Sequence, residues 1–214
     1  MATLFTIGRA RRILPFLTPI QPNTGDKAMD TPLFRIEHDL LGDREVPADV
    51  YYGVHTLRAR ENFAITGTAI SIYPELIKAL ACIKQAAALS NHELGLLDEQ
   101  RCNAISAACT ELLDGKLREQ FVVDVIQGGA GTSTNMNANE VIANRALELL
   151  GHRKGEYQYL HPNEQVNIGQ STNDVYPSAL KIATWFGILG LIDAMAVLRQ
   201  AFEAKAEEFQ DVLK

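Results

Sequence analysis

The 214-residue sequence lacks any block of basic residues, and its formal net charge at pH 7 is −6. Nucleic acids and membrane surfaces are recognised through clustered positive charge. The composition therefore argues against a nucleic-acid or membrane partner. With 47% hydrophobic and 21% charged residues, the chain has the composition of a globular protein that buries a substantial core.

Cysteine is also scarce, with only Cys82, Cys102 and Cys109, and their spacing is not that of metal ligands. Cys102 and Cys109 are about two helical turns apart. An odd number of such thiols favours buried, reduced cysteines in a cytoplasmic protein. The sequence also offers no Ser-His-Asp set for nucleophilic catalysis, and we expect no metal site.

The first residues differ from the rest because no acidic side chain precedes Asp26, while three arginines lie within residues 9–12. A basic, acid-poor leader resembles an organelle transit peptide. No long apolar run follows the arginines, so a secretory signal is not expected. The other interpretation is a misassigned start, with translation beginning at Met29. Transit peptides are amphipathic, and the leader has no sustained amphipathic period, so the second interpretation is favoured. Neither interpretation gives residues 1–28 a part in the fold.

Helix signals dominate the chain after residues 34–62, which look loop-rich with room for short strands. First-turn proline, capping aspartate and terminal glycine set the expected boundaries. Three helices are predicted, from Pro74 to about Leu94, from Asp98 to Gly115, and from near Asn137 to Gly151. The apolar, β-branched stretch Gln120–Gln127 predicts either a short strand or a buried extended segment.

The last helix is predicted from Asp174 to Lys214, with Pro177 in its first turn. Between Lys181 and Asp193 every residue is uncharged and apolar side chains occur on all sides of the helix. This run is shorter than the roughly 20 residues that cross a bilayer. It therefore predicts a central helix of a bundle, about 60 Å long, whose partners come from a large oligomer, from a continuation of the chain, or from both.

Three polar stretches carry the chemistry: QGGAGTSTNMN (Gln127–Asn137), HPNEQVN (His161–Asn167) and QSTNDVYP (Gln170–Pro177). Hydroxyls, amides and the free N–H groups of a helix N-terminus together form a receptor for an anion such as a carboxylate. Ser171 or Asn173 alternatively serves only as a helix cap. Phosphate binding is disfavoured, because the Walker and dinucleotide glycine patterns are both missing.

These stretches, with RIEHDLLG (residues 35–42) and VPADVYYGVHTLRARENF (residues 46–63), resemble the aspartase/fumarase superfamily from about Arg35 to Lys214. Class II fumarases usually read GSGTQSNMN in the glycine-rich loop and SSND in the later loop. The present GGAGTSTNMN and STND are similar to the aspartate ammonia-lyase branch. The resemblance implies a mainly α, aspartase-like fold: residues 29–173 form the N-terminal domain, and residues 174–214 form the first, incomplete part of the central helical bundle.

The resemblance also implies a reaction, the reversible elimination of ammonia from L-aspartate to give fumarate through an enediolate. It places Thr132, Ser171 and Thr172 on the β-carboxylate of the substrate. Asn173 is placed on the amino group or the α-carboxylate, and Ser133 lies beside them. Neutral donors of this kind suit a carboxylate that gains charge in the transition state.

A second, peripheral dicarboxylate site is implied by His161 and Asn163, which match an HPN motif described in fumarases. Glu164 stands where those enzymes usually carry Asp, so the sequence departs from the family pattern there. An ordinary packing role for His161 is the alternative.

The serine loop of pattern GSSxMPxKxN, which carries the catalytic base in the family, does not occur in the sequence, nor does a downstream Thr-His or Thr-Gln pair. The resemblance implies a cytoplasmic homotetramer without cofactor, whose active sites combine three subunits, and predicts that the 214-residue chain alone is inactive. Three other functions stay open: a class II fumarate hydratase, a non-catalytic truncated helical scaffold, and a module that only binds dicarboxylates.

Overall fold

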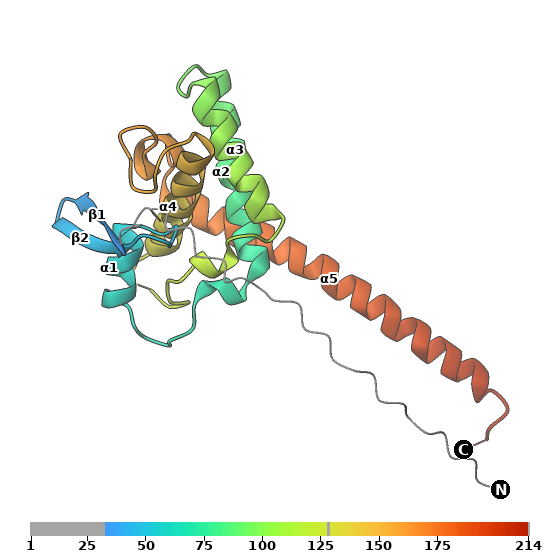
Figure 1. Cartoon of the computed structure of the whole chain (residues 1–214). Coiled ribbons are helices and arrows are strands. Elements are labelled where there is room, and N and C mark those ends of the chain that lie inside the picture. Colours follow the sequence, from blue (N-terminus) through green and yellow to red (C-terminus); the bar gives the residue numbers. More distant parts are fainter. Residues whose placement is uncertain (1–32, 128, 214) are drawn as a thin grey trace, which may run out of the picture. The chain divides into compact units, whose positions relative to one another are not determined.

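The computed structural model describes residues 33–127 and 129–213. The predicted leader, residues 1–28, and the first residues of the predicted N-terminal domain lie outside the described part. Within it, α-helices predominate and the only sheet has two strands (Figure 1). The expectation of a mainly α fold is confirmed.

The strands β1 (Phe34–Asp39) and β2 (Gly42–Pro47) form an antiparallel hairpin in which Phe34 pairs with Pro47 and Asp39 with Gly42. The helices follow in the order α1 (Val54–Asn62), α2 (Pro74–Glu93), α3 (Glu99–Leu113), α4 (Thr132–Leu149) and α5 (Thr172–Glu208). Short single turns connect them: η1 (Ile70–Ile72), η2 (Arg118–Gln120) and η3 (Pro162–Val166).

The core lies where α2, α3 and α4 pack together and the first turns of α5 cross α2 (Figure 1). One stripe of α2 faces this core at the helical spacing of three and four residues. It consists of Ile77, Leu80, Lys84, Ala88 and Asn91, all buried. Two polar residues therefore share a stripe that is otherwise apolar. Cys102 and Cys109 of α3 are buried free thiols, and Cys82 is half-buried.

The predicted boundaries of α2 and α3 are confirmed. Pro74 is the first residue of α2, where its missing N–H leaves no helical bond unmade. The Asp98 carboxylate accepts a hydrogen bond from the backbone N–H of Arg101 at 2.9 Å and caps α3. Gly115, just after α3, has a φ of +84°, the left-handed conformation that ends a helix.

The predicted start of α4 near Asn137 is wrong, because α4 begins at Thr132. Gly131 precedes it with a φ of 89°, and the Gln127 side chain accepts from the backbone N–H of Thr134 at 3.0 Å. These contacts turn the polar stretch into the first turns of a helix. Low helix propensity suggested a loop there, and tertiary contacts override it.

Residues 121–125 of the stretch Gln120–Gln127 form a largely buried extended segment rather than a regular strand, whereas Gln120 ends η2 and Ile126 is exposed. Phe121 and Val123 are buried, and only an isolated bridge joins Ala69 to Asp124. The backbone N–H of Ile70 donates to the carbonyl of Val123 at 2.9 Å. Of the two predicted alternatives, the second is confirmed.

The long helix is confirmed, but three of its predicted details are wrong. It starts at Thr172 rather than Asp174, because the Ser171 hydroxyl accepts from the backbone N–H of Asn173 at 3.2 Å and caps it. Pro177 therefore falls in the second turn, where its ring leaves the carbonyl of Asn173 without its usual helical donor. At the other end the helix stops at Glu208, short of the predicted Lys214.

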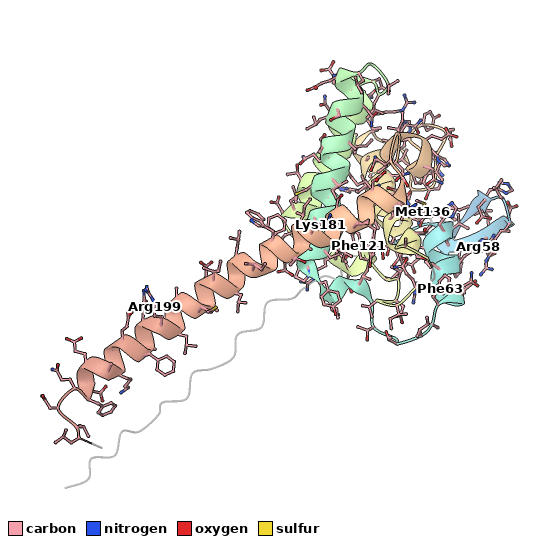
Figure 2. The ribbon with its side chains drawn as sticks, turned by 180° about the vertical axis from the view of Figure 1, so that it is seen from behind. Arg58, Phe63, Phe121, Met136, Lys181 and Arg199 are labelled. Atoms are coloured by element: carbon pink, nitrogen blue, oxygen red, sulfur yellow. The ribbon has the colours of Figure 1, made fainter. Side chains whose placement is uncertain are left out.

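Most of α5 is exposed (Figures 1 and 2). Figure 2 shows Lys181 where α5 leaves the other helices, and Arg199 far along its free part. Large apolar side chains are exposed along this part, at Trp185, Ile188, Leu189, Leu191, Ile192, Met195, Val197, Leu198 and Phe202. By length and composition α5 would suffice to cross a membrane, since its most apolar 18-residue window has a mean hydropathy of 1.6.

A buried polar cluster joins the hairpin, α1 and α4. Glu140 of α4 is fully buried and accepts from the backbone N–H groups of Gly53 and His55, both at 2.8 Å. Burial, followed by the nearby charge of Glu37, raises the pKa of Glu140. A Cβ on Gly53 would lie 2.5 Å from Oε2 of Glu37 and 2.6 Å from the hydroxyl of Tyr157. The φ of Gly53 is −118°, which any residue adopts, so the lack of space alone demands glycine there.

We therefore expect Gly53→Ala to lower the free energy of unfolding by about 1–3 kcal/mol, the range for overpacking a buried site. Gly187→Ala, in the middle of α5, is the control without close contacts, because no atom of the described residues lies within 4 Å of the added methyl group. Alanine in a helix interior should raise the free energy of unfolding by about 0.5–1 kcal/mol. Chemical denaturation compares each variant with the wild type, and a Gly53→Ala protein as stable as the wild type would show that the contacts around Gly53 are not tight.

Candidate functional site

The N-termini of α4 and α5 meet, although they are far apart in the sequence. A Cβ on Gly131 would lie 2.2–2.5 Å from ring atoms of Tyr176, so the backbone entering α4 rests directly on a side chain of α5. One turn further on, Nδ2 of Asn135 donates to Oγ1 of Thr172 at 3.0 Å. Thr132 and Thr172, the first residues of the two helices, therefore belong to one region of the surface.

This region concentrates hydrogen-bond donors. A helix N-terminus leaves its first backbone N–H groups without helical partners, and its dipole favours a negative charge. Two such termini meet here, with the hydroxyls of Thr132 and Ser133 on α4 and of Thr172 on α5. Thr132 is exposed, while Ser133 and Thr172 are half-buried. The arrangement suits a small anion better than a cation.

Ser171 and Asn173 flank Thr172 and are exposed. The capping role that the sequence left open holds for Ser171, whose oxygen accepts from the N–H of Asn173. A capping hydroxyl keeps its own hydrogen, so capping and donation to a ligand are compatible. The structure thus places Thr132, Ser133, Ser171, Thr172 and Asn173 at two adjoining helix starts.

Sequence reasoning missed the polar residues beneath this surface. Nζ of Lys84 donates to Oδ1 of Asn167 at 2.8 Å and to Oε1 of Gln170 at 2.9 Å. Oδ1 of Asn167 also accepts from Nδ2 of Asn135 at 3.1 Å, and Asn135 reaches Thr172. Lys84 could have been identified from the sequence, because a lysine interrupts the apolar stripe of α2. Asn167 and Gln170 could not, because the sequence shows them only as polar residues in a loop.

Lys84 is fully buried, and burial lowers the pKa of its ammonium group to about 7. The nearby Cys109 acts in the opposite direction with a smaller effect on the pKa. Burial also raises the pKa of the Cys109 thiol to about 12. The thiol is therefore neutral near pH 7, and the partners of Lys84 are uncharged amide oxygens.

Among the described residues, no hydrogen bond joins the side chains of His161, Asn163 and Glu164 to the starts of α4 and α5. Nδ1 of His161 accepts from the backbone N–H groups of Asn163 at 3.1 Å and Glu164 at 3.3 Å, capping η3. The ring also meets Tyr157 edge-on at 5.6 Å, and burial lowers the pKa of His161. A local structural role thus accounts for His161, and the second dicarboxylate site stays a prediction.

The lowered pKa of Lys84 links stability to pH. The pKa is near 7 in the folded chain and 10.5 as its unperturbed value. Between these values the unfolded chain holds a proton that the folded chain releases, so this group makes the folded chain more stable as the pH rises. We expect the denaturation midpoint of the wild type to rise more between pH 7 and 9 than that of Lys84→Met. Parallel pH profiles of the two proteins would contradict the lowered pKa.

Comparison with known proteins gives a consistent result. A family model described as "Lyase" matches residues 42–214. Aspartate ammonia-lyase of Escherichia coli (strain K12) is 59% identical over 181 residues, and that of Pseudomonas canavaninivorans is 60% identical over 181 residues. These alignments cover 84% and 85% of this chain. The chain spans only 38% of the length of these curated relatives.

Two crystal structures have a similar fold. The fumarate lyase:delta crystallin structure from Brucella melitensis, in native form, superposes with a TM-score of 0.82 at 54% identity, covering 84% of this chain and 42% of that one. Class II fumarase from Schistosoma mansoni superposes with a TM-score of 0.66 at 38% identity, covering 70% of this chain and 31% of the fumarase chain. The chain therefore belongs to the lyase family, and its fold is that of the aspartase/fumarase superfamily.

Proposed function

We propose that this chain supplies the carboxylate-binding part of an aspartate ammonia-lyase, which eliminates ammonia from L-aspartate to give fumarate. The observation that carries the proposal is the meeting of two helix N-termini with threonine hydroxyls at their first residues, Thr132 and Thr172. The high identity to aspartate ammonia-lyases over most of the chain supports the same assignment.

The chemistry explains why such a site needs neutral donors. The reaction removes a proton from the carbon next to a carboxylate, and the resulting charge spreads into that carboxylate as an enediolate. Donors already in place stabilise this charge without rearranging, which lowers the barrier. In the proposed site Thr132, Ser171 and Thr172 hold the β-carboxylate, and Ser133 adds a further hydroxyl. Asn173, exposed beside them, contacts the amino group or the α-carboxylate.

Aspartate is preferred over malate as the proposed substrate for two reasons. The glycine-rich stretch GGAGTSTNMN and the later STND both have the form seen in aspartate ammonia-lyases rather than in class II fumarases. The identity is also higher to aspartate ammonia-lyases, 59–60%, than to the class II fumarase of known structure, 38%. Fumarate hydratase activity is therefore the second candidate.

The exposed apolar side chains of α5 support an assembled protein. Ile192, Met195, Leu198 and Phe202 line one hollow along the free part of the helix. A soluble monomer rarely leaves so large an apolar surface in water. We infer that α5 packs against helices of other copies in a cytoplasmic homotetramer, rather than crossing a membrane. Lys181, Asp193 and Arg199 are spaced along the helix, and a bilayer core would penalise such charges.

The activity is tested with a lyase-length chain, defined here as this chain joined after Lys214 to the matching C-terminal part of Escherichia coli aspartate ammonia-lyase. We expect it to form fumarate from L-aspartate and not from L-malate, as followed by the ultraviolet absorbance of fumarate. The 214-residue chain alone should form none, since the serine loop of the family does not occur in its sequence. Formation of fumarate from malate alone would overturn the choice of substrate.

The assembly is tested by placing charge on α5. In the lyase-length chain we expect Leu191→Asp combined with Leu198→Asp to convert a tetramer into smaller species, because burying an unpaired carboxylate is strongly unfavourable. Leu96→Asp is the matched control, at an exposed leucine before α3. Light scattering after gel filtration gives the masses. A monomeric wild type, or binding of the wild type to lipid vesicles, would contradict the proposed assembly.

A further inference from the structure

Lys84 is unusual because, in the part of the chain that the structure describes, its buried ammonium group donates no hydrogen bond to a carboxylate. Both oxygens that it reaches belong to neutral side chains, Asn167 and Gln170. Lysine is almost never fully buried unless it is paired with a negative charge, since burial of a lone cation is unfavourable. Retaining such a group at the centre of the packed helices suggests a role beyond packing.

The hydrogen bonds of Lys84 fix the orientation of an amide. An ammonium group can only donate, so Asn167 must turn its oxygen toward Lys84. Its nitrogen, Nδ2, then donates to the backbone carbonyl of Gln170 at 3.0 Å. With both ends engaged, the side chain of Asn167 has one favourable orientation.

The orientation of Asn167 in turn determines that of Asn135. Oδ1 of Asn167 faces Asn135, so Asn135 must present its nitrogen there, and the same nitrogen donates to Oγ1 of Thr172. The oxygen of Asn135 is buried and has no hydrogen-bond partner among the described residues. The network therefore holds Asn135 in this orientation even though it leaves an acceptor unsatisfied.

The hydrogen bond from Asn135 to Thr172 determines whether the Thr172 hydroxyl is free to donate to a ligand. Because its oxygen already accepts from Asn135, the hydroxyl hydrogen of Thr172 is free to point away from the network. A hydroxyl with a free hydrogen can donate to an anion. An Asn135 side chain turned the other way would offer an oxygen, which would compete with the ligand for that hydrogen.

We propose that Lys84 is a positioning residue for the carboxylate site, which acts through Asn167 and Asn135 to keep the Thr172 hydroxyl directed at the substrate carboxylate. This inference rests on the proposed function, because it assumes that Thr172 binds the carboxylate that gains charge. Lys84 does not touch the substrate.

The protonation state of Lys84 matters to this role. With its pKa near 7, Lys84 loses the ammonium form as the pH rises, and the neutral amine can accept as well as donate. The constraint on Asn167 then relaxes. The titratable side chain that influences Lys84 from the packed helices is Cys109 of α3, whose thiol stays neutral over this range, while Asn135 of α4 and Asn167 and Gln170 before α5 do not titrate.

A double-mutant cycle on the lyase-length chain tests the proposal. Below pH 7, where Lys84 keeps its ammonium form, Lys84→Met should lower kcat for L-aspartate by roughly tenfold or more with a smaller change in KM, since slight misplacement of a binding group lowers the rate up to about 10²-fold. In a Thr172→Val background, Lys84→Met should lower kcat by less than about twofold, because the hydroxyl it positions is already gone. Lys78→Met, on the same helix but half-buried, is the control and should keep wild-type kcat.

A multiplicative loss in the Thr172→Val background, or unchanged kcat in Lys84→Met, would overturn the proposal. Asn167→Leu replaces Lys84→Met if that variant does not fold, because among the described residues Asn167 is linked to Thr172 only through Asn135. It should also be non-additive with Thr172→Val. Wild-type kcat should in addition fall as the pH rises above about 7. An additive cycle together with a flat pH profile would overturn the proposal in that case.

The outcome is separable from that of the proposed function. If the lyase-length chain converts malate instead of aspartate, the same cycle is measured with malate. Both substrates carry a β-carboxylate at which charge develops, so non-additivity between Lys84 and Thr172 would support the positioning role even though the substrate assignment had failed.

Discussion

The close approach of two helix starts is the constraint on which the rest of the site depends. Gly131 leaves room for the ring of Tyr176, and Asn135 bonds to Thr172 across the contact. Any side chain at Gly131 would clash with the ring and would also have to adopt a left-handed φ. Because α4 and α5 also carry core residues, the donors at their N-termini are held by the packing of the whole domain.

The polar side chains beneath the surface determine which way the hydrogen-bonding groups at the two helix starts point. An apolar core would position the helices equally well, but it would not decide which way an amide or a hydroxyl points. A buried group that can only donate, such as the ammonium of Lys84, imposes a direction on each partner in turn. Preorganised donors of this kind suit a reaction whose main difficulty is charge that appears only in the transition state.

Local signals in the sequence predicted much of the fold. Pro74, Asp98 and Gly115 act within a few residues of their own positions, so the limits of α2 and α3 could be predicted from them. The start of α4 could not, because its polar first turns are stabilised by distant contacts such as that between Asn135 and Thr172. The end of α5 at Glu208 also had no strong local signal, since neither glycine nor proline follows.

The candidate site was predictable only in part, for the same reason. Thr132, Ser171 and Thr172 were found through their polar stretches and their resemblance to a family, and the structure brings their helices together. Lys84 lies far from them in the sequence, and nothing local to it indicates the partners Asn167 and Gln170. Its place in an apolar stripe was a usable signal, but the direction it gives to Thr172 follows only from the hydrogen-bond network.

Carboxylate binding between the two helix starts can be seen in a crystal structure of the lyase-length chain with succinate, an unreactive dicarboxylate. We expect one carboxylate of succinate within about 3 Å of the hydroxyls of both Thr132 and Thr172, with the nitrogen of Asn135 still bonded to Thr172. Succinate bound elsewhere, with these two hydroxyls unoccupied, would show that the two helix starts are not the carboxylate site.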